Sequence, residues 1–117
     1  MKNDIIVVIK KGSAKMKLKM ITKKSGRIFF IDENGNRFNK VGYYWSSGFF
    51  NDGVACVAFK KNSFSRKKYL RNDGTFISDE CFIKGEDGFT FGSVKVMREN
   101  GEWCYLDYNG KFHTDKP

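Results

Sequence analysis

The chain has 117 residues and a formal net charge of +9, with 40% hydrophobic and 16% aromatic residues. This length suits one domain of the usual ~100–150 residues, and the hydrophobic content excludes a disordered chain. Its apolar runs are too short for a membrane span of ~18–20 residues or a signal-peptide core of ~7–15 residues, so we expect one cytoplasmic domain over residues 1–117 without a membrane partner.

The first predicted strand is rich in lysine. Between residues 15 and 20 lysine alternates with apolar residues, so a strand here points its lysines to one face and its apolar side chains into the core. The lysines are Lys15, Lys17 and Lys19, and the apolar residues are Met16, Leu18 and Met20. Lys23 and Lys24 belong to the same positive segment, because residues 1–27 carry a net charge of +8.

An aromatic run, Tyr43, Tyr44 and Trp45, comes next in the chain. These residues fall outside the positions that recur along the sequence, so we predict that they lie on the surface. Exposed aromatic rings beside lysines offer stacking platforms for a ligand. The three residues are therefore candidates for partner binding.

A basic cluster lies in the next predicted hairpin. Residues 60–71 carry a net charge of +6 and no acidic residue, whereas residues 72–117 sum to −4. Stacking of the hairpins is expected to bring this cluster close to the lysine-rich first strand. The candidate partner-binding residues of the cluster are Lys60, Lys61, Arg66, Lys67, Lys68 and Arg71.

Recurring motifs organise the chain. Gly35, Gly74 and Gly110 each close a similar segment at spacings of 39 and 36 residues, and Gly53 and Gly92 are again 39 apart. Asn-Gly and Asp-Gly dipeptides tolerate positive φ and are typical of tight hairpin turns, and a single hairpin cannot bury its apolar face alone. The pattern predicts an all-β fold of antiparallel hairpins, from about three tandem repeats stacked into a small solenoid or a partly open sheet assembly. The repeats span residues 14–48, in which the first strand has diverged, 49–87 and 88–113, followed by a tail over 114–117.

These motifs resemble the WG repeat family of bacterial β-repeats, in which F-x-x-G-x-A-x-V is followed after a turn by W-x-Y-h-D-x-x-G-K. The copy from Phe89 to Lys111 fits best, and it places Trp103 at the tryptophan of the pattern. In the other copies Ile28, and Arg66 or Lys67, replace that tryptophan, and Arg71 replaces the aspartate. The resemblance covers residues 14–113 and implies a non-enzymatic repeat used for recognition.

The repeat positions also predict parts of the core. Trp103 is expected to be largely buried between stacked hairpins. Phe50 and Phe89 or Phe91 recur at the repeat spacing, which favours a role in packing.

No pattern for catalysis is present. The single histidine, His113, lies in the tail with no neighbour that makes it a base for a nucleophile. The cysteines Cys56, Cys81 and Cys104 are odd in number and widely spaced, so we interpret them as reduced, buried thiols. We predict no catalytic residues, no cofactor and no metal site, and hence a protein that is not an enzyme.

Charge and resemblance together favour a protein-binding module, acting as a small inhibitor or adaptor on an acidic protein or a nucleic-acid-binding groove. The alternative is direct binding of RNA or DNA through the lysine-rich strands, although no known nucleic-acid-binding motif is present. A third interpretation is that the lysines only prevent edge pairing and keep the protein soluble. The excess of lysine over arginine, typical of an AT-rich coding sequence, indicates a bacterial or phage origin.

Overall fold

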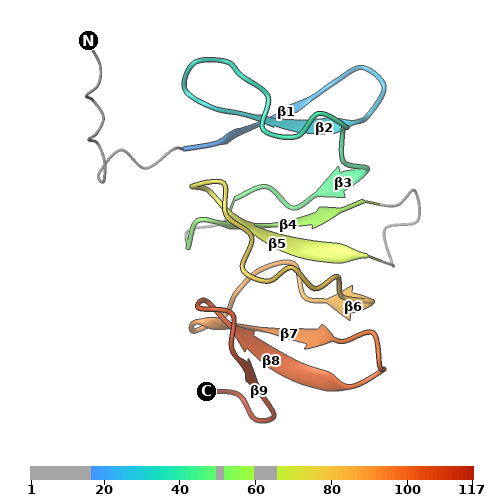
Figure 1. Cartoon of the computed structure of the whole chain (residues 1–117), viewed down its shortest axis with the longest axis vertical. Helices are drawn as coiled ribbons and strands as arrows, with labels where there is room; N and C mark the ends of the chain where they lie inside the picture. The colour runs from blue at the N-terminus through green and yellow to red at the C-terminus, as the bar shows by residue number, and fades with distance from the viewer. Residues whose placement is uncertain (1–16, 50–51, 60–65) are drawn as a thin grey trace.

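A computed structural model describes residues 17–49, 52–59 and 66–117 (Figure 1). The fold of this part is all-β, as predicted, with antiparallel sheets of two, three and four strands that do not close into a barrel. No helix among these residues is long and apolar enough to cross a membrane. Lys15, Met16, Phe50, Lys60 and Lys61 lie outside the described residues.

Each sheet is centred on one hairpin. The first sheet contains β1 (Lys19–Thr22) and β2 (Ile28–Ile31). The second contains β3 (Trp45–Ser46), β4 (Val54–Ala58) and β5 (Lys67–Arg71). The third contains β6 (Lys84–Gly85), β7 (Ser93–Met97), β8 (Trp103–Asp107) and β9 (Phe112–His113).

The turns that follow β2, β5 and β8 are built alike. Gly35, Gly74 and Gly110 have φ of 84°, 91° and 90°, a region that glycine enters without steric cost. Each glycine donates a hydrogen bond from its N–H to the carbonyl oxygen three residues earlier. The donor–acceptor distance is 3.0 Å in all three turns. The prediction that glycine makes these turns is therefore confirmed.

The second sheet lies between the other two (Figure 1). Along β4 the side chains alternate: Ala55 and Val57 pack in a core cluster with the first sheet, and Val54 and Cys56 pack in a second cluster with the third sheet. Every residue of β4 is consequently buried. Burial on both faces explains why this strand reads as a continuous apolar run.

Some predicted core residues lie elsewhere. Trp103 is 47% exposed, so the prediction of its burial is wrong: along β8 it is Cys104 and Leu106 that turn toward the second sheet. Phe91 is 90% exposed in a turn with φ of 52°, whereas Phe89 packs against the core as predicted.

The three cysteines are free thiols, as predicted. Cys56 and Cys104 are buried, but Cys81 is only half-buried. Burial raises the pKa of Cys56 to about 12, so this thiol stays protonated and unreactive at neutral pH.

Candidate partner-binding surface

The segment Tyr43 to Trp45 connects the first two sheets. Tyr43 exchanges backbone hydrogen bonds with Ile28 of 2.8 and 2.9 Å, and this pairing turns its ring inward. The ring packs edge-on against Phe59 at 5.1 Å and is only 6% exposed. Burial raises the pKa of Tyr43 to about 12. The prediction that Tyr43 lies on the surface is therefore wrong.

Tyr44 is exposed, as predicted, and its ring contacts a cation that was not among the predicted binding residues. The guanidinium carbon of Arg27 lies 4.0 Å from the centre of the Tyr44 ring, and Arg27 Nη2 donates a 2.8 Å hydrogen bond to the tyrosine hydroxyl. Arg27 Nη1 donates to the carbonyl oxygen of Gly42 at 3.1 Å. In the sequence, Arg27 is the last cation of the positive segment before β2. This position was the feature that could have identified it as a candidate.

Trp45 lies beside a cation of the second hairpin. Trp45 pairs with Ala58 across β3 and β4, and Ala58 pairs with Lys67 across β4 and β5. The Lys67 ammonium is 5.9 Å from the centre of the indole ring. The ring is half-buried against the core, so its remaining exposed part and the ammonium face solvent together.

The turn between β1 and β2 and the turn between β7 and β8 lie on one side of the stack, at the right of Figure 1, where β5 begins. Lys23 and Lys24 are exposed in the turn between β1 and β2. Arg66 directly precedes β5 and forms a 3.5 Å ion pair with Glu99 in the turn between β7 and β8. We call this group the tip surface, and it comprises Lys23, Lys24, Arg27, Tyr44, Trp45, Arg66 and Lys67.

The lysine-rich first strand behaves as predicted over part of its length. Lys17 and Lys19 are exposed and Leu18 is buried, but Met20 is 41% exposed and not a full member of the core. Met20 extends toward Gly48, beside the first sheet, where no strand covers it in the described residues.

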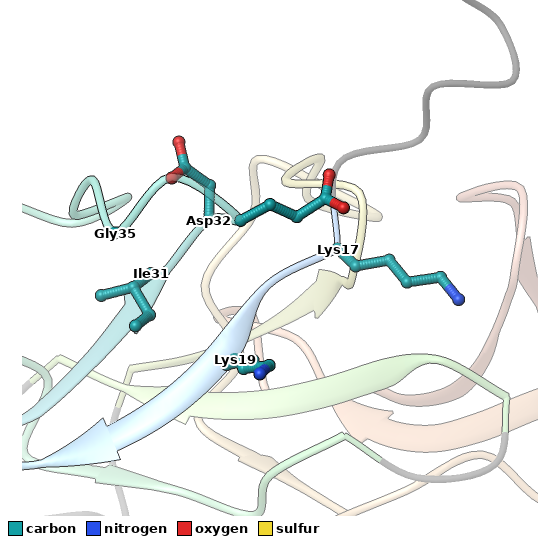
Figure 2. Close-up of a pocket in the computed structure, with 6 residues that line it drawn as sticks. Lys17, Lys19, Ile31, Asp32 and Gly35 are labelled. Carbon is teal, nitrogen blue, oxygen red and sulfur yellow. The ribbon is translucent and has the colours of Figure 1, made fainter.

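Lys17 and Lys19 line an open pocket of about 400 Å³ (Figure 2). Asp32, Glu33, Gly35 and Ile31 complete its lining, so two carboxylates accompany the two amines. The pocket lies near the turn after β2, at the opposite end of the hairpin from Lys23 and Lys24. These lysines therefore do not extend the tip surface.

Two partly exposed cations of the basic cluster contact other residues of the chain. The Lys68 ammonium lies 4.9 Å from the ring centre of Phe76 and 5.7 Å from that of Phe59. Arg71 donates to Thr75 Oγ1 at 3.1 Å, and also to the carbonyl oxygen of Tyr108. Lys68 and Arg71 therefore support packing and turn structure, and their role in partner binding stays a prediction.

The predicted basic residues thus do not share one face. Lys67 and Lys68 are neighbours in β5, and alternation sends them to opposite faces of the second sheet. Lys19 projects with Ile21 from the face of the first sheet that lies away from the second, because Leu18 takes the inward position. Among the described residues, stacking therefore does not place Lys19 on one face with Lys67 and Lys68, whereas Lys15, Lys60 and Lys61 lie outside these residues.

His113 lies in β9 rather than in a free tail. It shares a 2.8 Å hydrogen bond with Asp107 Oδ2, and this contact holds the pKa of the Asp107 carboxyl below its usual value. Asp107 also accepts the backbone N–H groups of Asn109 and Lys111. Among the described residues no group of three or more His, Cys, Asp or Glu side chains could hold a metal ion.

Comparison with protein-family models, curated proteins and solved structures found no match to this chain.

Proposed function

We propose that the protein is a non-enzymatic binding module whose tip surface docks on an acidic surface of a partner protein. The observation that carries this proposal is the pairing of Arg27 with Tyr44 and of Lys67 with Trp45, whose two aromatic residues are adjacent in the chain. Arginine, tyrosine and tryptophan are the residues most enriched among those that dominate interface energetics.

Charge supports the same conclusion. Within the described residues, Lys23, Lys24, Arg27 and Lys67 form no ion pair, and only Arg66 of the tip surface has a carboxylate partner. A cluster of unpaired cations attracts an anionic surface and accelerates encounter in a salt-dependent way. A small module of this kind suits an inhibitor or an adaptor.

The WG repeat interpretation is part of the proposal. In this interpretation the central hairpin of each sheet comes from one repeat, and β3 and β6 join the end of one repeat to the sheet of the next. The matching turns after β2, β5 and β8 support it, as do the core clusters that join each sheet to its neighbour. Repeat arrays present extended surfaces made by equivalent positions of successive units.

Direct binding of RNA or DNA is the second candidate. Exposed lysines beside aromatic rings favour it, because phosphates and bases use such pairs. However, the Arg27 guanidinium already covers the Tyr44 ring at 4.0 Å, and Trp45 packs partly on the core. A protein surface, which needs no free ring face, fits this geometry better.

A capture experiment with matched charge variants tests the proposal. The tip variant is Lys23→Glu with Lys24→Glu, and the control is Lys17→Glu with Lys19→Glu, which makes the same change in charge at the other end of the hairpin. All four side chains are exposed, so both variants should keep the wild-type melting temperature. Each protein is used to capture partners from lysate of the source organism, with and without nuclease.

We expect the wild type and the control to retain the same protein partner after nuclease treatment, and the tip variant to lose it. Loss of the partner from every sample after nuclease would favour nucleic acid as the ligand. If the tip variant and the control lose the partner equally, net charge alone determines binding. If both retain the partner, the lysines only keep the protein soluble.

A further inference from the structure

No other sheet covers the outer face of the third sheet in the described residues, although the Lys116 ammonium lies 5.6 Å from the centre of the Tyr105 ring on this face. Lys95, Met97, Trp103 and Tyr105 project from β7 and β8 away from the second sheet, since their neighbours Val94, Val96, Cys104 and Leu106 turn into the core. Trp103 is 47% exposed, and the Lys95 ammonium lies 5.2 Å from its ring centre. Exposed apolar faces of this kind are typical of interaction sites.

The equivalent face of the second sheet shows what such a face can bind. Counted from the turn that follows each hairpin, Tyr105 corresponds to Tyr69, and its partner Lys95 corresponds to Cys56. Cys56 and Tyr69 are 0% and 1% exposed, because the third sheet packs over them. The face of the second sheet that is equivalent to the outer face of the third sheet is therefore covered by another sheet of the same chain.

The first sheet has the matching face at the other end of the stack, where Phe29 is only 9% exposed and the Arg37 guanidinium lies 4.3 Å from its ring centre. Its Ile21–Phe29 pair corresponds to Val96–Cys104, and its Lys19–Ile31 pair corresponds to Val94–Leu106. In the third sheet those positions form the surface that covers Cys56 and Tyr69. The two ends of the molecule thus carry the two sides of an interface that already exists inside it.

The hairpin tips of the first and third sheets carry opposite charges. The tip of the third hairpin carries the exposed Glu99 and Glu102, and the tip of the first carries the exposed Lys23 and Lys24. Within the chain, tips on adjacent hairpins already pair in this manner, since Arg66 binds Glu99. At the other side the exposed Lys111 of the last turn matches the acidic first turn with its Glu33.

We infer that the chain associates head to tail with a second copy of itself, the outer face of the third sheet packing on the outer face of the first sheet of the next molecule. The contact is heterologous and does not close, so longer linear assemblies form as concentration rises. Lys19 and Lys95 lie at positions whose equivalents, Val94 and Cys56, share one core cluster, so their repulsion weakens the association. The charged edge of this contact shares Lys23 and Lys24 with the tip surface, but its apolar part lies outside the tip surface, so Trp103→Ser tests the association separately.

Sedimentation equilibrium of the purified full chain at low salt provides the test. We expect a mass that rises with concentration beyond that of a dimer, and an association that Lys95→Met strengthens. Glu99→Lys with Glu102→Lys should weaken it by about tenfold, and Lys23→Glu with Lys24→Glu should do the same, since each reverses a set of exposed ion pairs. A chain that carries all four changes restores opposite charges at the contact and should recover wild-type association.

Trp103→Ser provides a test without charge, because an exposed indole can be removed without opening the core. It should abolish association while the melting temperature at low concentration stays unchanged. A wild-type protein that remains monomeric up to millimolar concentration would overturn the inference. So would a dimer that ignores charge reversal at Lys23 and Lys24, because that result means back-to-back packing of two third sheets.

Discussion

Arg71 connects the turn of the second hairpin to that of the third. It donates a hydrogen bond to the carbonyl oxygen of Tyr108, and its guanidinium carbon lies 4.8 Å from the centre of the Tyr108 ring. The residue that replaces the aspartate of the WG pattern thus provides a contact between neighbouring sheets.

Replacing Arg71 with alanine should therefore destabilise the fold. Loss of charged hydrogen bonds and of the cation–aromatic contact should lower the free energy of unfolding by about 1–3 kcal/mol, measured by urea denaturation. Arg37→Ala is the matched control, because Arg37 is exposed and its guanidinium lies 4.3 Å from the ring centre of Phe29 within the first unit. Equal losses in the two variants would show that the contact between turns adds nothing.

Trp103→Ala should cost little stability, because the indole is on an uncovered face. We expect less than about 1 kcal/mol. Phe82→Ala should instead cost about 3–5 kcal/mol, since Phe82 is 0% exposed in the core cluster between the second and third sheets. Thermal unfolding of dilute samples compares the two, and similar losses would place Trp103 in the core after all.

Acid should weaken the last turn through Asp107. Its folded-state pKa is lowered, first by the hydrogen bond with His113, so the carboxylate contributes stability that is present above its ordinary pKa of 3.8 and is lost as pH falls through the folded value. Asp107→Asn should therefore flatten the loss of stability between about pH 5 and pH 2. Asp79→Asn, which removes an exposed carboxylate, should leave the wild-type pH profile unchanged.

Arg27→Gln should reduce partner capture more than it reduces stability. Glutamine keeps a polar side chain but loses the charge and the planar contact with Tyr44. Isothermal titration with the captured partner should show about tenfold weaker binding, and the melting temperature should change by only a few degrees. Lys40→Gln removes another exposed charge from the same unit, and it should bind as the wild type does.

Local features of this protein were readable from the sequence. The glycine turns at Gly35, Gly74 and Gly110 follow from the conformational freedom of one residue, and alternation along β4 and β7 follows from the pleat of a strand. The all-β class, the buried Leu18 and the free thiols needed no more than this. These properties depend on residues within a few positions of one another.

The packing of the sheets decides which side chains are buried and which residues lie together on the surface. Periodicity places Trp103 and Cys104 on opposite faces of β8, but only the position of the second sheet determines which face is covered. Tyr43 is buried because its backbone pairs with Ile28, and Arg27 joins the tip surface because Tyr44 lies beside it. Such contacts join segments well separated along the chain, so their outcome depends on how whole sheets stack, and no local pattern contains that information.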